Sequence, residues 1–167
     1  RSTARPATDR RTLFTLEGVT ATMQPSELTT LVSGLLHEET QVTDRGLDLT
    51  VGEVLTVETP GRVDFGGDEL RHANCAAHEK VWRNDEDDYQ WWHLDGGQYL
   101  VEYNETFSTD RPLRVQTRDA LRELGAFHPT LELTELGRVP LSVSSGGIRL
   151  KENARISTVL PPESESE

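Results

Sequence analysis

The hydrophobic positions that follow Met23 have the spacing of an amphipathic helix. They recur three and four residues apart, at Leu28, Leu31, Val32, Leu35 and Leu36. Pro25 and Ser26 are residue types that favour a helix start, whereas Gly34 lowers the helical propensity of the segment. The spacing predicts one N-terminal amphipathic helix that ends near His37.

Beyond residue 46 the hydrophobic period changes to two, which is typical of strands. Short alternating segments, separated by turn-forming residues, predict strands near 47–51, 54–57, 63–65, 99–103, 113–115, 131–133, 139–143 and 156–160. A polar excursion separates two of these segments, at residues 66–97. One further short helix is predicted from Arg118 to Leu124, closed by Gly125. This pattern predicts a mainly β fold, a sandwich or a jelly-roll-like distorted barrel.

Length and composition limit the classes of protein that need to be considered. The chain has 167 residues, of which 34% are hydrophobic, and this suits one globular domain, which we place at residues 23–160. The acidic residues 161–167 are expected to form a disordered tail. No apolar run approaches the about 20 residues of a membrane helix. The single Cys75 excludes a disulfide framework within the chain and a multi-cysteine zinc module.

The formal net charge of -12 argues against nucleic acid as the main partner, because binding to phosphate backbones needs clustered cations. Lys80 and Lys151 are the only lysines among the 17 basic residues. An acidic, arginine-rich and lysine-poor chain is typical of a protein from a salty, halophilic cytoplasm, where mutual repulsion is screened. An ordinary acidic domain is the alternative. We expect a cytoplasmic protein.

Residues 1–22 differ in charge from the remainder of the chain. The segment contains four arginines and two acidic residues, Asp9 and Glu17, which gives a net charge of +2. The segment lacks the continuous apolar core of a secretory signal. It is either a flexible basic arm or an extension upstream of a natural start at Met23. We favour the extension and assign the segment no function.

Several segments, read in order, resemble the motifs of one family. They are Gly46-Leu47-Asp48-Leu49, the strand 97–103, Arg118-Asp119-Ala120-Leu121 followed by Gly125, Leu131-Glu132-Leu133, Val139-Pro140-Leu141 and Asn153-Ala154-Arg155-Ile156. Their sequence and order resemble the dUTPase and dCTP deaminase superfamily, whose motifs include Gly-x-Asp-Leu, Arg-Ser-Ser-Leu and Leu-Glu-Phe. The resemblance extends from about residue 23 to residue 160.

The resemblance implies a homotrimer of distorted β-barrels that binds a deoxynucleoside triphosphate, dCTP or dUTP, at the subunit boundaries. It also implies Mg²⁺ on the triphosphate and, for the deaminase branch, no zinc. Glu132 falls on the position of the catalytic acid/base, and a buried strand position would raise its pKa. The alternative is an outward-facing carboxylate. Arg118, Asp119, Ala120 and Asp48 fall on substrate-binding positions, although Asp48 could also be structural.

The chain departs from the family pattern at the phosphate-binding motif. Asp119 replaces a serine, and Glu123 stands where the deaminases have a catalytic arginine. At an effective dielectric constant of about 20, a unit charge about 4 Å from a phosphate changes binding by about 4 kcal/mol. Both reversals therefore oppose triphosphate binding unless a metal ion, Arg114 or Arg122 restores the balance. Residues 127–130 replace a longer loop of the family. Thr158 stands where the family's Ala-Gln pair ends, and the C-terminal glycine-rich loop of trimeric dUTPases is absent from the sequence.

Three other groupings and one single histidine carry side chains with possible functional chemistry. His72, Cys75 and His78 have a spacing that an open zinc site accepts, or they belong to a solvated insertion. The acidic residues 85–88 lack the ligand spacing of a calcium loop. Trp91 and Trp92 should point to opposite faces of a strand, in a packing or interface role or, alternatively, for base stacking. His128 has no evident nucleophile beside it in the sequence, which favours a structural role.

Two hypotheses on function follow. The first is a hydrolase that acts on deoxynucleoside triphosphates and most resembles a dCTP deaminase, with Glu132 as acid/base and Arg118 as phosphate anchor. The second is a catalytically degenerate trimeric relative with a regulatory, binding or assembly role. The retained Glu132 and Arg118 favour the first hypothesis, whereas the charge reversals at Asp119 and Glu123 favour the second.

Overall fold

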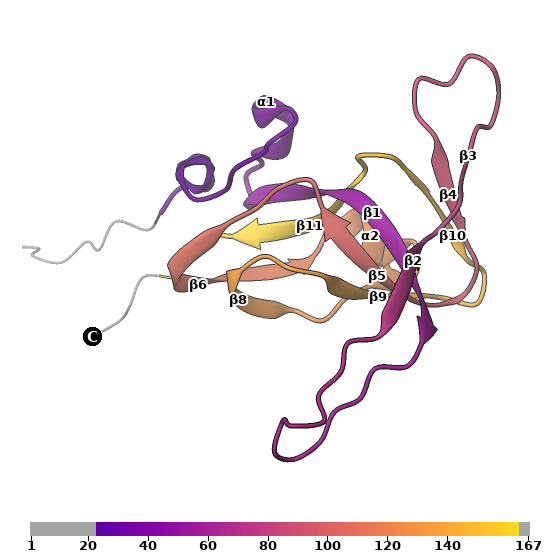
Figure 1. Ribbon diagram of the computed structural model, residues 1–167. Coiled ribbons are helices and arrows are strands. Elements are labelled where there is room, and N and C mark those ends of the chain that lie inside the picture. The colour runs from indigo at the N-terminus through magenta and orange to yellow at the C-terminus, as the bar shows by residue number, and fades with distance from the viewer. Residues whose placement is uncertain (1–22, 164–167) are drawn as a thin grey trace, which may run out of the picture.

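A computed structural model describes residues 23–163 of the protein (Figure 1). The basic segment 1–22 and residues 164–167 of the acidic tail lie outside the described residues. The elements, in chain order, are η1 (Pro25–Thr30, a 3₁₀-helix), α1 (Glu38–Gln41), β1 (Leu47–Thr59), β2 (Asn74–Ala77), β3 (Lys80–Val81), β4 (Trp91–Leu94), β5 (Gly97–Tyr103), β6 (Ser108–Thr117), α2 (Asp119–Glu123), β7 (Ala126–Phe127), β8 (Leu131–Glu135), β9 (Val139–Val143), β10 (Ile148–Lys151) and β11 (Arg155–Leu160). None of the helices in this part of the chain is long and apolar enough to cross a bilayer.

Antiparallel pairing joins most of these strands into one curled sheet. Within residues 23–163 its order is β7-β9-β5-β1-β11-β6-β8, and β2 pairs with the far end of β1. A smaller sheet has the order β10-β4-β3. The mainly β, barrel-like fold predicted from the sequence is confirmed.

β1 is the central strand of the large sheet, and its 13 residues change partner along their length. Its first residues pair with β11, and its later residues pair with β5 and then with β2. Leu47, Leu49 and Val51 are fully buried, and the intervening Asp48 and Thr50 are buried as well. The first half of β1 is therefore covered on both faces, which places a carboxylate inside the molecule.

The predicted N-terminal amphipathic helix is wrong. The short η1 ends at Thr30, and Ser33 then pairs with Thr106 as an isolated β-bridge. Gly34 follows with φ +84°, a left-handed conformation that ends any helix. The apolar residues that suggested a helix do reach the core, since Leu28 and Val32 are buried, but Leu36 is exposed. The spacing identified buried positions correctly and their secondary structure incorrectly.

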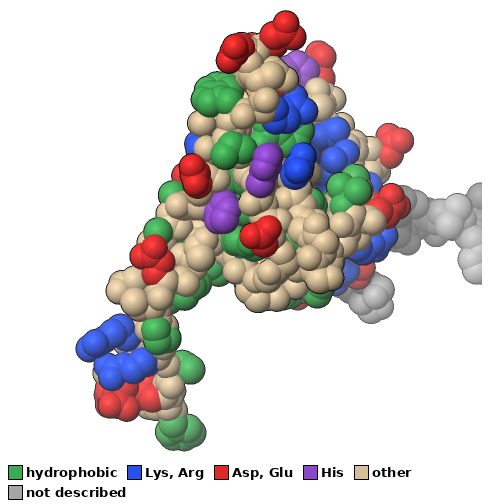
Figure 2. Space-filling view, turned by 90° about the vertical axis from the view of Figure 1, so that its right-hand side faces the viewer, with side chains coloured by type: hydrophobic (Ala, Val, Ile, Leu, Met, Phe, Trp, Pro, Cys, Tyr) green, Lys and Arg blue, Asp and Glu red, His purple; other side chains and the backbone are tan. Residues whose placement is uncertain are grey.

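The predicted strand at residues 63–65 is also wrong. This segment belongs to the long connection between β1 and β2, which projects from the body of the molecule (Figure 1). Val63, Phe65 and Leu70 are exposed there, and Figure 2 shows hydrophobic and charged side chains together on the projecting lower lobe.

The polar excursion contains three strands. It contributes β2 to the large sheet and β3 and β4 to the small one. Trp92 is fully buried whereas Trp91 is only partly buried, so the two tryptophans do point to opposite faces. The Lys80 ammonium forms an ion pair with Glu152 at 2.7 Å, which links β3 to the residue that follows β10.

The predicted helix after Arg118 is confirmed as α2. Leu121 is its buried residue, and Gly125 has φ +87°, the conformation of a glycine that ends a helix. The α2 helix follows Arg118 at the end of β6 and contacts β7, and its first residues Asp119 and Ala120 line the same pocket as Asp48 of β1.

We expect a Gly46→Ala substitution to lower the free energy of unfolding by about 1–3 kcal/mol, the usual cost of overpacking. A Cβ atom on Gly46 would overlap the carbonyl oxygen of Val159 on β11. The matched control is Gly137→Ala, because a Cβ at Gly137 meets no atom within 4 Å. Urea denaturation measures both, and equal effects of the two substitutions would contradict the close approach of β1 and β11.

Candidate functional site

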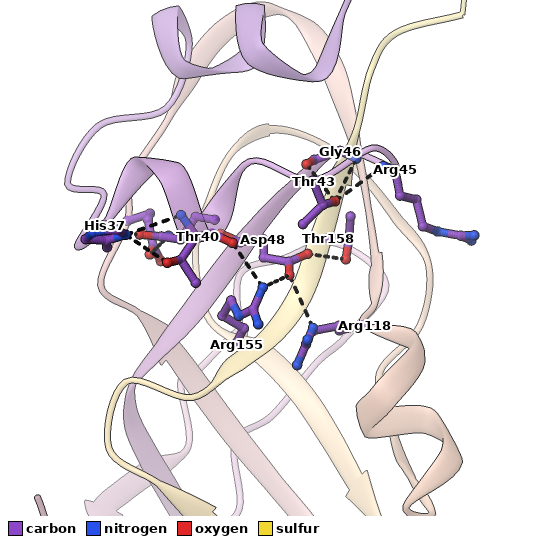
Figure 3. Close-up of polar contacts among 11 residues, drawn as sticks. His37, Thr40, Thr43, Arg45, Gly46, Asp48, Arg118, Arg155 and Thr158 are labelled. Carbon is purple, nitrogen blue, oxygen red and sulfur yellow. Dashed lines mark hydrogen bonds and ion pairs between the residues drawn. The ribbon is translucent and has the colours of Figure 1, made fainter.

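The buried carboxylate of Asp48 is the centre of the candidate site (Figure 3). Its Oδ2 atom lies 3.1 Å from Nη1 of Arg155 and 3.2 Å from Nε of Arg118. Its Oδ1 atom accepts a hydrogen bond of 2.8 Å from the hydroxyl of Thr158. The Asp48 side chain is 4% exposed, whereas those of Arg118 and Arg155 are 31% and 29% exposed. Both oxygens of the carboxylate are thus occupied, and the two guanidinium groups extend from it towards solvent.

Segments far apart in the sequence supply these groups. Asp48 lies on β1 directly opposite Thr158 of β11, and Arg155 begins the same β11 strand. Arg118 lies between β6 and α2, and its backbone N–H donates to the carbonyl of Ile156 at 3.0 Å. Antiparallel pairing of β1, β11 and β6 therefore brings the family-like motifs around Asp48, Arg118 and Arg155 to one place.

An open pocket of about 270 Å³ adjoins this cluster, lined by Thr43, Arg45, Asp48, Arg118, Asp119, Ala120 and Thr158. It contains the four predicted substrate-binding residues and adds Arg45, which the sequence did not single out. The Thr43 hydroxyl donates to the Gly46 carbonyl and accepts from the Arg45 and Gly46 N–H groups, and so shapes the turn that carries Arg45. The Gln116 amide oxygen accepts from Nε and Nη2 of Arg45 at 3.0 and 2.7 Å when the amide is oriented to satisfy both groups.

Asp119, the residue that reverses the expected charge, lies between two arginines. Its Oδ2 atom is 3.4 Å from Nη1 of Arg45, and its Oδ1 atom is 3.4 Å from Nη2 of Arg122. Arg122 is therefore one of the compensating cations considered from the sequence, whereas Arg114 is bound elsewhere. The ion-paired groups around the pocket are four arginines and two aspartates, so these paired side chains together carry a net charge of +2 (4 minus 2).

A second open pocket of about 260 Å³ lies on the other side of Arg155, lined by Leu36, His37, Thr40, Gln41, Thr50, Asn153, Ala154 and Arg155. Arg155 also donates to the Thr40 carbonyl at 3.0 Å, so its guanidinium links Thr40 of this pocket to Asp48 of the first pocket. A buried network lies behind the second pocket, in which the Glu105 carboxylate accepts from the Gln41 amide at 2.7 Å and from the Thr50 hydroxyl at 2.6 Å.

Glu132 lies on β8 as predicted, but the expected burial of its carboxylate is wrong. Its side chain is 62% exposed and forms an ion pair of 3.0 Å with Arg114, which also binds Glu163 at 3.1 Å. These three residues line a separate pocket of about 210 Å³ with Arg111 and nearby prolines. The outward-facing alternative describes its position in the protomer, and its role as acid/base stays a prediction.

The side chains that line the first pocket fit Mg²⁺ that is bound to the phosphates of a triphosphate and approached by one protein carboxylate. Asp48 has no free oxygen for a metal, whereas Oδ1 of Asp119 is shielded from solvent and makes no hydrogen bond within residues 23–163. Mg²⁺ is commonly held by one or two carboxylates and the phosphates of a substrate. Three metal-binding side chains do not come together anywhere in the described part of the chain, and this includes His72, Cys75 and His78.

The acidic run at residues 85–88 has a local ion pair. Arg83 binds Asp87 through Nη2 at 2.7 Å, and this hydrogen-bonded guanidinium lowers the pKa of Asp87 to about 2. The same guanidinium lies 4.2 Å from the centre of the Trp91 ring. The contacts support a packing role for Trp91.

His128 is buried in a hydrogen-bonded chain, so the structural role predicted for it fits its environment. Nδ1 lies 2.7 Å from the Pro129 carbonyl oxygen, and Nε2 lies 2.7 Å from the hydroxyl of Ser157. Since Nδ1 donates to the carbonyl, Nε2 accepts from Ser157, whose oxygen in turn accepts from the Tyr103 hydroxyl at 2.6 Å. Ser157 is a hydroxyl that the sequence did not place beside His128, but it is fully buried and out of reach of a substrate.

Comparison with solved structures identifies the fold. A crystal structure of 2'-deoxycytidine 5'-triphosphate deaminase from Agrobacterium tumefaciens matches with a TM-score of 0.53 and 16% sequence identity, over 78% of this chain and 43% of that chain. The chain therefore spans less than half the length of that deaminase and shares its fold. No family model matches the sequence.

Comparison with curated relatives identifies the family. A probable deoxyuridine 5'-triphosphate nucleotidohydrolase from Methanosarcina acetivorans is 33% identical over 137 residues, which is 78% of this chain and 77% of the relative. A probable deoxyuridine 5'-triphosphate nucleotidohydrolase from Methanococcoides burtonii is 28% identical over the same shares. The chain belongs to the dUTPase/dCTP deaminase superfamily.

We expect Asp48→Asn to lower the free energy of unfolding by about 2–3 kcal/mol, because hydrogen bonds to a charged group are lost. The substitution removes the anion that both guanidinium groups approach within 3.2 Å. Asp119→Asn is the matched control, and its more exposed ion pairs should contribute less than about 1 kcal/mol. Urea denaturation of both variants checks this, and a small effect of Asp48→Asn would contradict the central role of the buried carboxylate.

We expect the stability of the protein to fall as the pH drops below about 6.5, in part because of His128. Burial lowers the pKa of His128, so the unfolded chain binds this proton more readily than the folded chain. The stabilising contribution of neutral His128 is present above about pH 6.5 and is lost as the pH falls towards the lowered folded pKa. Chemical denaturation between pH 5 and 8 should show a shallower slope for His128→Gln, whereas substitution of the exposed His93 should leave the slope unchanged.

Proposed function

We propose that the chain is a hydrolase that acts on a pyrimidine deoxynucleoside triphosphate. The observation that carries this proposal is the pair of half-buried guanidinium groups of Arg118 and Arg155. Both are anchored on the buried Asp48 carboxylate, and each lines one of two open pockets. Guanidinium groups bind phosphate oxygens with directed hydrogen bonds. The terminal nitrogens of Arg118 have no partner among the described residues and are available to a ligand.

Two reactions fit a nucleotide in this pocket. In the first, water hydrolyses dUTP to dUMP and pyrophosphate, and the curated relatives named after this activity favour it. In the second, water deaminates dCTP to dUTP and ammonia, which the sequence resemblance favoured. Mg²⁺ bound to the phosphates would offset part of their charge in either reaction. Arg118 and Arg155 would orient the phosphates, and Asp48 would hold both guanidinium groups in place.

Glu132 would serve as acid/base only if a second subunit contributes it. In one protomer it lines a different pocket from Arg118, so the proposal includes a homotrimer with the site at the subunit boundary. The exposed position on β8 leaves this carboxylate accessible to a neighbouring subunit.

A catalytically degenerate relative is the second candidate. The two negative charges of Asp119 and Glu123 in and beside the phosphate-binding motif favour it. Such a protein would keep the pocket for binding, regulation or assembly, and would turn over neither nucleotide.

We expect the purified chain, in molar KCl with Mg²⁺, to release pyrophosphate from dUTP or ammonia from dCTP. Arg118→Ala should lower kcat/KM by about tenfold to hundredfold, the loss expected for a hydrogen bond to a charged group. Glu132→Gln should lower kcat by about 10²-fold or more with little change in KM, the signature of a lost general acid/base. Product chromatography and a pyrophosphate assay measure both reactions.

The matched control for the acid/base is Glu135→Gln, another exposed carboxylate of β8. If Glu132→Gln leaves kcat unchanged, the acid/base assignment is wrong even where activity persists. Absence of both reactions favours the degenerate relative. A monomer by light scattering would overturn the shared site.

A further inference from the structure

We propose that Asp119 makes the arginine-lined pocket select the magnesium complex of a pyrophosphate-type anion over the metal-free anion. This inference deepens the proposed function, since it concerns the same pocket. Two carboxylates, those of Asp48 and Asp119, line the pocket. Of the two carboxylates there, Asp48 has both oxygens occupied by Arg118, Arg155 and Thr158.

Asp119 is less completely bound than Asp48. Each of its oxygens lies 3.4 Å from an arginine nitrogen, of Arg45 and Arg122 respectively. These separations are longer than those of charge-assisted hydrogen bonds, which are about 2.7–2.9 Å. Its Oδ1 atom is shielded from solvent and makes no hydrogen bond within residues 23–163. The side chain as a whole remains 41% exposed at the pocket. Asp119 is therefore held by charge attraction and retains an oxygen with capacity for another partner.

This carboxylate affects the two forms of a ligand in opposite ways. A metal-free polyphosphate that enters the pocket brings its negative oxygens against the negative Asp119, and the repulsion opposes the attraction of Arg45 and Arg118. A phosphate-bound Mg²⁺ removes this repulsion, because the ion and its water shell present positive charge and hydrogen-bond donors to carboxylate oxygens. The same residue then excludes one form and accepts the other, which is how specificity arises from a repulsive group.

The competing explanation is that Asp119 only neutralises Arg45 and Arg122. In that case its removal would strengthen binding of every anion by the same factor, and the preference for the magnesium complex would not change. The two explanations therefore differ in the ratio of two affinities rather than in either affinity alone.

The experiment is calorimetric titration with inorganic pyrophosphate at constant ionic strength, once with excess Mg²⁺ and once with EDTA. We expect the wild-type chain to bind the magnesium complex at least about tenfold more tightly than metal-free pyrophosphate, as expected when a like-charge contact is relieved. Asp119→Asn should reduce this ratio by at least about fivefold, mainly through tighter binding of the metal-free anion. Asp119→Ser should behave in the same way.

The matched control is Asp44→Asn, an exposed aspartate next to Arg45 that does not line the pocket. It removes the same charge nearby and should leave the ratio within about twofold, as expected for a screened surface charge. Arg118→Ala should weaken binding of both forms by about tenfold or more, the loss expected for a hydrogen bond to a charged group, which assigns the titration to this pocket. Thermal unfolding of each variant verifies that it folds.

The inference is overturned by an unchanged ratio in Asp119→Asn or by an equal change in Asp44→Asn. It is also overturned if Arg118→Ala leaves binding unchanged, or if pyrophosphate does not bind in either form. Its failure is distinguishable from failure of the proposed function. A chain that turns over neither dUTP nor dCTP but shows the Asp119-dependent ratio retains the selective pocket without the activity. A chain that hydrolyses a nucleotide without this ratio retains the activity and loses the inference.

Discussion

The arrangement of the site depends on one buried carboxylate with two cations. Burial of an isolated carboxylate is costly, and a single partner often fails to offset that cost. Asp48 avoids this problem because two guanidinium groups and one hydroxyl share its two oxygens. Each guanidinium remains about one-third exposed and so keeps much of its hydration. Since the four groups come from β1, β11 and the end of β6, the ion cluster also fixes how these three strands meet.

This arrangement separates positioning from binding. The Asp48 side chain is almost completely buried, so its role is to hold Arg118 and Arg155. Arg118 lines the first pocket, and Arg155 lines the second. A guanidinium has five N–H donors in a planar fork, and contact with Asp48 uses one nitrogen of each arginine. The remaining donors point outward with a fixed orientation. Lysine would not provide this, because one ammonium group cannot both bind a buried carboxylate and present a planar set of donors.

The sequence predicted those parts of the fold that depend on local patterns. Alternation located most strands of the large sheet, and Gly125 marked the end of α2. The predicted helix before residue 38 was wrong because its apolar spacing is helical, while the bridge between Ser33 and Thr106 is a tertiary contact that no local pattern contains. Strand β3 was missed for a similar reason, since its two residues are too short for an alternating pattern and are defined by their pairing with β4.

The candidate site was predicted from sequence motifs. The site residues that were not predicted are those that no local sequence pattern marks. Arg118, Asp119, Ala120 and Asp48 were expected and do come together. Arg155 lay inside a recognised motif, but its contact with Asp48 spans 107 residues of sequence. Arg45 directly precedes the motif 46–49, and its ion pair with Asp119 is a tertiary contact that no local pattern contains. Glu132 was located correctly on its strand, yet alternation alone could not decide which face of β8 it occupies.

The charge reversals have different consequences once their surroundings are known. At an effective dielectric constant of about 20, a unit charge at about 4 Å from a phosphate opposes binding by about 4 kcal/mol. Asp119 has Arg45 and Arg122 within 3.4 Å, and these cations offset part of its negative charge before a ligand arrives. Glu123 is exposed and does not line the pocket, so solvent screens it. The acidic surface and the anion pocket are therefore compatible in one chain, because four arginines gather around the two aspartates where a polyanion would bind.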